Sequence, residues 1–251
     1  MQAEYIDHMG DDLRVVNAAR VSFDKESEWE YEGDKPCQCS EGGPWVKCGC
    51  YSGVSLSEKD QKLISYLAKH NHWTPFSHVM VTMRETVPIF VARQRFKHMV
   101  GFTYNEVSRR YVDDEPEFYF PDKWRKRADN KKQGSSEEEV KEIFIPDYAE
   151  GYKSEPGFAY SAFLDYARFL YEGMVKSGVA PEQARMVLPQ SMYTSYYTTG
   201  SLPAWARAYK LRVDTNAQKE IQELAVEWNK VISNISELKH SWSALIGEEK
   251  A

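Results

Sequence analysis

Cysteine is absent from most of this chain, and its absence excludes one class of chemistry. All four cysteines fall in one short stretch, at Cys37, Cys39, Cys48 and Cys50. Covalent catalysis by a thiolate therefore has no candidate elsewhere in the chain.

Long apolar runs are also missing. Runs such as residues 87–92 are far shorter than the ~18 residues that a membrane-spanning helix needs. Residues 1–12 carry acids and no apolar core, which is not the pattern of a signal peptide. We therefore expect a cytoplasmic protein with no membrane partner, in a compartment that does not favour disulfides.

The chain lacks an excess of positive charge as well. Its formal net charge is −6, whereas general nucleic-acid-binding proteins are more often basic because contacts to phosphate dominate their affinity. We therefore expect no nucleic-acid partner, although a local basic pocket for a small phosphate is compatible with this composition. The length of 251 residues fits one large domain or two small ones.

Hydrophobic periodicity predicts a chain that mixes helices with strands. Ser57 suits a helix N-cap because Asp60 follows three residues later, in the manner of a capping box. That helix ends near Asn71, a residue that tolerates left-handed backbone. The predicted elements are an apolar opening element at 13–23, this helix, a strand at 79–87, a helix from Pro88 to about Val100 that Gly101 ends, a polar loop or short element at 102–111, a long helix at about 157–177, a short helix from Pro181, a strand at 192–198, and two further helices, the last with an apolar seam from Ala217 to Leu238.

Two segments interrupt this pattern. Residues 24–54 show no period and predict an insertion or extended loop. Their four cysteines match the number of thiolates that Zn²⁺ takes tetrahedrally, so a structural zinc at Cys37, Cys39, Cys48 and Cys50 is one prediction. The C-x-C spacing is a weaker match than the usual one and leaves free thiols, or a disulfide formed on purification, as alternatives. Residues 122–142 are highly charged and predict a solvated surface excursion; the alternative is that their basic half meets a phosphate.

The residues that carry chemistry are concentrated between positions 70 and 111. Ser108, Arg109 and Arg110 combine a hydroxyl with forked guanidinium donors, which suit phosphate oxygens. Arg185 and Arg212 are further cations, and a fold that brings all five residues together would bind an anionic nucleotide. Composition alone leaves open that the basic residues form a solvated helix face.

Several sequence blocks resemble the flavin-dependent thymidylate synthases. HNHWTPFSH resembles the family's His-x-His-x-x-Pro-Phe-x-His segment. PIFVARQRFKH resembles the helix leading into its signature, Arg-His-Arg followed seven or eight residues later by Ser, and NEVSRRY resembles the Asn-Glu-x-Ser-x-Arg-Tyr that closes it. AARVSF before these blocks, and ARMVLP, YKLR and AQKEI after them, match in the same order. The resemblance covers most of residues 13–225, interrupted at 24–54 and 122–142.

This resemblance implies a fold, an activity and an assembly. The fold is a mixed α/β (α+β) domain, here one domain over residues 1–251, with a mainly antiparallel sheet flanked by long helices. The activity is conversion of dUMP to dTMP with methylenetetrahydrofolate, FAD and NADPH, in which reduced flavin supplies the hydride and no enzyme cysteine attacks the pyrimidine. The assembly is a homotetramer with active sites at subunit interfaces.

The resemblance also assigns residues to ligands. The predicted catalytic residues are Arg212, placed against the pyrimidine where a cation could stabilise negative charge, and Ser108, a phosphate or substrate ligand since a hydroxyl without an adjacent base is a poor nucleophile. Positions matching dUMP contacts are Gln94, Glu106, Ser108, Arg109, Arg110, Arg185 and Arg212. Positions matching FAD contacts are Ser22, His72, Thr74, Lys97, His98, Met99, Ser201 and Arg207.

The chain departs from the family on the flavin side. Lys97 and Met99 replace the two arginines of the signature; lysine keeps the charge but loses the planar fork, and methionine loses both. Ser77 stands where glutamate is usual, Pro203 where an arginine often holds the flavin, and Arg207 where Asn or His is common. Three functions therefore stay open: thymidylate synthesis with a remodelled flavin pocket, a related modification such as hydroxymethylation of dUMP or dCMP, and a nucleotide-binding homo-oligomer without flavin chemistry.

Overall fold

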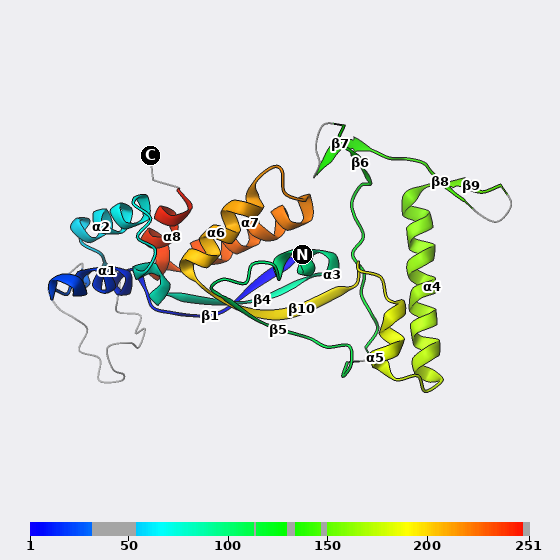
Figure 1. Ribbon diagram of the computed structural model, residues 1–251, viewed down its shortest axis with the longest axis horizontal. Helices are drawn as coiled ribbons and strands as arrows, with labels where there is room; N and C mark the ends of the chain where they lie inside the picture. Colours follow the sequence, from blue (N-terminus) through cyan, green and yellow to red (C-terminus); the bar gives the residue numbers. More distant parts are fainter. Residues whose placement is uncertain (32–53, 113, 130–133, 147–149, 248–251) are drawn as a thin grey trace.

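The body of the protein is an antiparallel sheet with helices on one face (Figure 1). The computed structural model describes residues 1–31, 54–112, 114–129, 134–146 and 150–247. The four strands of the sheet, in spatial order, are β1 (Gln2–Met9), β4 (Met80–Pro88), β10 (Tyr193–Ser201) and β5 (Phe102–Glu106). Every pairing between them is antiparallel, which confirms the predicted fold class.

The central strand β4 shows why only one face of the sheet is covered. Val81, Met83 and Val87 are fully buried, whereas Arg84 between them is exposed. This alternation is the period of two that places successive side chains on opposite faces of a strand. The outer face is polar at its centre, where the hydroxyls of Thr82 and Thr199 lie 3.0 Å apart across β4 and β10.

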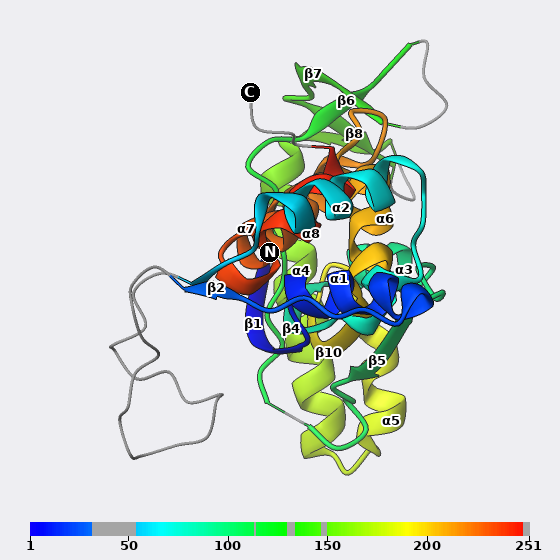
Figure 2. The same ribbon diagram turned by 90° about the vertical axis from the view of Figure 1, so that its left-hand side faces the viewer.

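Helices cover the apolar face and one end of the sheet (Figures 1 and 2). The helices of the body are α1 (Asp12–Arg20), α2 (Glu58–Lys69), α3 (Ile89–Arg95), α6 (Leu202–Val213), α7 (Lys219–Ser233) and α8 (Lys239–Ile246). Trp205, Trp228 and Trp242 are buried in their shared core, and the rings of Trp205 and Trp228 meet edge to face with centroids 5.7 Å apart. Such large buried rings dominate the apolar burial of a core.

Local sequence signals at Ser57 and Asn71 act as predicted. The Ser57 hydroxyl accepts the backbone N–H of Asp60 at 3.1 Å and caps α2. Asn71, after that helix, has φ +57°, and Gly101 has φ +81°. A side chain at position 101 would also approach the Ala204 Cβ to 2.8 Å, so the turn before β5 needs glycine both for its conformation and for space.

Asp12 ties the first helix to the last. Its carboxylate accepts the backbone N–H groups of His240 at 2.8 Å and Ser241 at 2.9 Å, at the start of α8. Burial raises the pKa of Asp12 from 3.8 to about 6, because desolvation outweighs the hydrogen bonds from Ser241 and His240 that favour the charged form.

A second group of elements projects beyond the end of the sheet at which β5 ends and β10 begins (Figure 1). It comprises α4 (Pro156–Lys176), α5 (Pro181–Ala184), the hairpin β6 (Arg125–Arg127) with β7 (Ser135–Glu139), and the hairpin β8 (Ile143–Ile145) with β9 (Tyr152–Ser154). Two short strands, β2 (Glu30–Tyr31) and β3 (Val54–Ser55), pair elsewhere. The long helix predicted at 157–177 and the short one from Pro181 are thus confirmed.

Two predicted helices were wrong at their ends, and one ambiguous prediction is resolved. The helix predicted to reach Val100 ends at Arg95, because the chain turns toward Gly101. The start of the polar stretch predicted as a loop or short element is strand β5, which gains its backbone partners from β10. The last predicted helix ends at Ser233, and the rest of its apolar seam leads into α8, which has no separate signal in the sequence.

The N-terminal strand and the charged excursion also differ from expectation. β1 was not predicted from residues 1–12, and its pairing with β4 is a long-range contact that no local pattern reveals. The excursion at 122–142 is not wholly solvated, since Arg125 forms an ion pair with Glu220 at 2.6 Å in which the two side chains are 14% and 5% exposed. None of the helices within the described ranges combines the length and the apolar composition that crossing a bilayer requires.

Candidate functional site

Cavities open at both ends of the three strands β4, β10 and β5. Met80 pairs with Ser201 at one end, and Thr86 pairs with Ser195 at the other. Each of these four residues lines the cavity at its own end. The rigid ladder between them therefore fixes how the two cavities are placed relative to each other.

The cavity beside Thr86, here called the Ser108 cavity, has a volume of about 750 Å³. Its cations are the four arginines Arg84, Arg109, Arg110 and Arg185, and its carboxylates are Glu106, Asp114, Glu115 and Glu117. Ser108 and Thr194 add hydroxyls, and the Thr194 hydroxyl donates to Glu106 at 2.7 Å. Four guanidinium groups from three segments of the chain, beside the hydroxyl of Ser108, are the donor set that a phosphate monoester needs.

Arg109, Arg110 and Arg185 are each held by a hydrogen bond within the protein and keep further donors. The Ser108 turn follows β5 and closes with a backbone hydrogen bond from Tyr111 to Ser108 at 2.9 Å. Arg110 donates through Nε to the Ser108 hydroxyl at 3.1 Å, Arg109 donates to the carbonyl of Asp114, and Arg185 donates to the carbonyl of Glu182 at 3.3 Å. A guanidinium has five N–H donors, so each of these groups keeps others for an anion.

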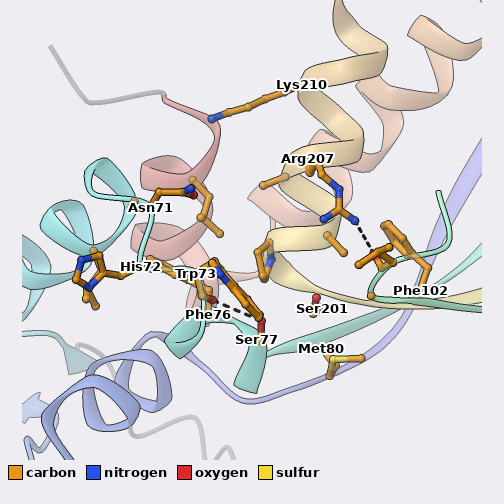
Figure 3. A pocket seen from close by; sticks show the side chains of 18 of the residues that line it. Asn71, His72, Trp73, Phe76, Ser77, Met80, Phe102, Ser201, Arg207 and Lys210 are labelled. Carbon is orange, nitrogen blue, oxygen red and sulfur yellow. Dashed lines mark hydrogen bonds between the residues drawn. The ribbon is translucent and has the colours of Figure 1, made fainter. Parts of the chain in front are cut away.

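The cavity beside Met80, here called the His72 cavity, has a volume of about 1080 Å³ (Figure 3). Apolar side chains such as Leu67, Phe76 and Leu211 form much of its wall. Arg207 and Lys210 of α6 also line it, whereas no Asp or Glu among the described residues does. An apolar cavity with cations at its edge suits a planar ligand that carries negative charge.

His98 lies in the turn that follows α3 and contacts α6. It is buried, and its Nε2 accepts a hydrogen bond from Arg212 Nε at 2.8 Å. Burial lowers the pKa of His98 to about 4, and the positive charges of Arg212, Arg95 and Arg207 add to this effect. Neutral His98 therefore acts as an acceptor at neutral pH and fixes the orientation of the Arg212 guanidinium.

Arg95, the last residue of α3, anchors that helix in the core. Its Nε donates to both carboxylate oxygens of Glu85 at 3.1 and 3.2 Å, and both side chains are fully buried. Tyr196 also donates to Glu85, at 2.7 Å. The phenol of Tyr104 accepts from Arg95 and donates to the carbonyl of His98 at 2.7 Å, so the same cluster holds the turn that carries His98.

The structure brings together most of the residues predicted to bind dUMP. Glu106, Ser108, Arg109, Arg110 and Arg185 all line the Ser108 cavity. The other two lie elsewhere on the described chain: Gln94 donates to Gln218, and Arg212 contacts His98.

The residues predicted to bind FAD are more scattered. His72, Ser201 and Arg207 line the His72 cavity, with Arg207 donating to the carbonyl of Val100. Lys97, His98 and Met99 lie in the turn after α3, where Met99 is 73% exposed. Ser22, in the 3-10 turn after α1, and Thr74, at the start of the next 3-10 turn, are not among the described residues lining either cavity.

The predicted zinc ligands lie outside the described residues. Cys37, Cys39, Cys48 and Cys50 all fall between positions 32 and 53. Within the described ranges, no three or more His, Cys, Asp or Glu side chains gather in a way that could hold a metal ion. Structural zinc in that segment stays a prediction.

Three residues of the cavities were missed in the sequence. Arg84 lies on the outer face of β4 and donates to the Ser195 hydroxyl at 2.9 Å at the Ser108 cavity. Trp73 and Lys210 line the His72 cavity. The signals available in the sequence were an arginine at the centre of an alternating strand, for Arg84, and a tryptophan next to His72, for Trp73.

Comparison with known proteins gives consistent relatives. The family described as Thymidylate synthase complementing protein matches residues 4–236. A flavin-dependent thymidylate synthase of Thermosipho africanus is 36% identical over 238 residues, covering 95% of this chain and 86% of that protein. One from Thermus thermophilus is 33% identical over 224 residues, covering 88% of this chain and 67% of that protein.

A solved structure has the same fold. A UMP/dUMP methylase, PolB from Streptomyces cacaoi, bound with 5-Br dUMP, superposes with a TM-score of 0.69 at 24% identity, covering 98% of this chain and 94% of PolB. The antiparallel sheet and its two cation-lined cavities thus define an α/β protein suited to phosphorylated, planar ligands. The chain belongs to the thymidylate synthase complementing protein family, whose relatives above are flavin-dependent thymidylate synthases.

Proposed function

We propose that this protein is a flavin-dependent thymidylate synthase that converts dUMP to dTMP, with methylenetetrahydrofolate as one-carbon donor and with FAD and NADPH. The observation that carries the proposal is the Ser108 cavity, which is lined by four arginines and by the serine of a Ser-Arg-Arg-Tyr turn. Relatives named for this activity cover most of the chain at more than 30% identity, which supports the same reaction.

In this proposal the Ser108 cavity holds the phosphate of dUMP. Arg109, Arg110 and Arg185 donate to its oxygens, and Ser108 orients it without acting as a nucleophile, since within the described part of the chain its hydrogen-bond partner is Arg110 and not a base. Arg84 adds a fourth cation on the β4 side. Charge-assisted hydrogen bonds from several guanidinium groups give both affinity and orientation.

Arg212 acts at the base. Its guanidinium is partly buried and is oriented by neutral His98, so it can stabilise negative charge that develops on the pyrimidine. Burial lowers the pKa of Arg212, and the Arg95 charge adds to this effect. A donor fixed in advance costs no reorganisation during the reaction.

The His72 cavity fits FAD. Its volume of about 1080 Å³ is slightly above the range of about 300–1,000 Å³ that is typical of small-molecule sites, as a dinucleotide cofactor requires. Arg207 and Lys210 place cations where the cofactor's phosphates need them, although Met99 and Pro203 lack the charge that the family often has. His72 and Ser201 offer polar groups, and the exposed ring of Trp73 offers a stacking surface. When bound and reduced, FAD supplies the hydride for the transfer.

The proposal includes a homotetramer. α4 carries an unpartnered row of apolar side chains on one side of the molecule: Phe158, Phe163, Tyr166, Phe169 and Leu170, of which Phe169 is 68% exposed. Contiguous apolar surface of this kind marks an interaction site. Gln94 and Arg212 do not line the Ser108 cavity of their own chain, so the proposal assigns them to the Ser108 cavity of another chain in the tetramer.

The test is a titration of the purified protein with FAD and then dUMP, followed by absorbance, with the product identified by mass. We expect a bound-flavin spectrum that dUMP perturbs, and dTMP as product. Arg110→Ala and Arg185→Ala should each weaken dUMP about 10- to 150-fold, the effect of losing a charge-assisted contact of about 1.5–3 kcal/mol. Lys62→Ala, an exposed cation on α2, is the control. Unchanged dUMP affinity in both arginine variants would defeat the assignment of the cavity.

A further inference from the structure

A chain of hydrogen bonds connects the charged excursion to a residue of the proposed dUMP site. Arg125 of β6 donates through Nη2 to Glu220 Oε1 at 2.6 Å. The other oxygen of Glu220 accepts from Gln218 Nε2 at 2.8 Å. The Oε1 atom of Gln218 in turn accepts from Gln94 Nε2. The four side chains form one continuous path from the hairpin, across the start of α7, to α3.

The chemistry of this path fixes the direction of both amides. An ionised carboxylate can only accept, so Gln218 must turn its NH₂ group toward Glu220. Its carbonyl oxygen then faces Gln94, which must turn its own NH₂ toward Gln218. Gln94 therefore presents its Oε1 away from the path. Reversing either amide would place two donors or two acceptors against each other.

Arg125 keeps Glu220 in the state that this order requires. Burial raises the pKa of Glu220, but hydrogen bonds from Arg125, its own backbone N–H and Gln218 outweigh burial, so the net pKa is lowered. Arg125 is itself held by Nε, which donates to the Ser135 hydroxyl of β7 at 2.7 Å. Without Arg125 the carboxylate would be largely buried without a cation, and it would either take up a proton or turn out to water.

We propose that Arg125, acting through Glu220 and Gln218, is a positioning residue that fixes the amide of Gln94 for nucleotide binding. This inference rests on the proposed function, in which Gln94 contacts dUMP. It gives the segment at 122–142 a role in substrate affinity that its composition does not suggest. Arg125 need not touch the nucleotide.

The test is a double-mutant cycle on the dissociation constant of dUMP, with Gln94→Ala, Arg125→Ala and the double variant. We expect Gln94→Ala to weaken dUMP about 3- to 10-fold, the effect of one lost hydrogen bond. Arg125→Ala should weaken it by no more than that, and the double variant should match Gln94→Ala alone. Arg125→Lys, which keeps the charge, should recover part of the affinity. FAD binding should be unchanged in all variants.

Arg127→Ala is the matched control, because Arg127 has the same charge on the same strand but is exposed and pairs with Ser135 at the far end of β6. Additive losses in the cycle, or an equal loss in Arg127→Ala, would mean general attraction of the anionic nucleotide and would overturn the inference. If Arg125→Ala does not fold, Gln218→Met breaks the middle of the path and is measured in the same cycle.

The outcomes separate this inference from the function on which it rests. Wild-type protein that does not bind dUMP would remove the proposed function and the inference together. Wild-type binding that Gln94→Ala weakens and both Arg125→Ala and Gln218→Met leave unchanged would overturn the inference alone.

Discussion

At the scale of single residues, the sequence shows which side chains are polar but not which of them are buried. Arg95 is the last residue of a helix that also carries Arg93, and its position alone indicates a solvated or ligand-binding cation. It is instead fully buried against Glu85, with its guanidinium 4.3 Å from the ring centroid of Phe102. Its partner lies on a strand ten residues earlier, and only the packing of α3 on β4 brings the two together.

The first prediction concerns this ion pair. Glu85→Gln should lower the free energy of unfolding by about 3–5 kcal/mol, because it leaves the buried guanidinium of Arg95 without a countercharge. Urea unfolding followed by tryptophan fluorescence, at one protein concentration, measures the change. Glu58→Gln is the control: Glu58 pairs with Lys62 on the surface, with side chains 88% and 79% exposed, and its loss should change stability by less than about 1 kcal/mol. Similar values for the two variants would contradict the buried-pair interpretation.

The candidate site was predictable where its residues are local in sequence. Ser108, Arg109 and Arg110 follow one another, and the structure places them with Arg185 in one cavity. The contact between His98 and Arg212 was not predictable, since 114 positions separate the two residues. Nor was the lowered pKa of His98, which arises from burial and from arginines on other elements.

At the scale of elements, prediction succeeded where caps and periodicity act locally. α2, with its Ser57 cap, and α4, which begins one residue before its predicted start, lie close to where the sequence places them. β1 and β5 were missed or left ambiguous because an edge strand is defined by its neighbour. α8 was missed because its N-terminus is held by Asp12, far away in the sequence.

This attachment of α8 gives a second prediction. Asp12 has a pKa of about 6 in the folded protein and 3.8 as an unperturbed group, so between these values the folded state binds a proton that the unfolded state does not. The contribution of Asp12 to the free energy of unfolding should therefore be greatest below about pH 4, fall as pH rises toward 6, and level off above that. Asp12→Asn removes the titration. Urea unfolding of both proteins from pH 4 to 7 should show their difference changing across this window; a constant difference would contradict the assignment.

At the scale of the whole molecule, the proposed assembly can be tested through α4. Phe169→Lys places a charge in the exposed apolar row of that helix and should disfavour association, because burying an unpaired ammonium in an interface is costly. Light scattering after size exclusion should show a tetramer for the wild type and smaller species for the variant. Val226→Lys, on an exposed site of α7, is the control. A tetramer of unchanged stability in Phe169→Lys would show that α4 is not part of the contact.

The ladder of β4, β10 and β5 has a consequence for how this protein can change over evolutionary time. β10 has nine residues and spans about 27 Å at 3.4 Å per residue, with one cavity at each of its ends. One residue inserted in this strand would shift the register beyond it and turn the following side chains to the other face of the sheet. Extra sequence is therefore tolerated where it leaves the pairing of β4, β10 and β5 unchanged, as at 24–54 and 122–142. Length differences between descendants of this chain should accumulate in such segments rather than within the three strands.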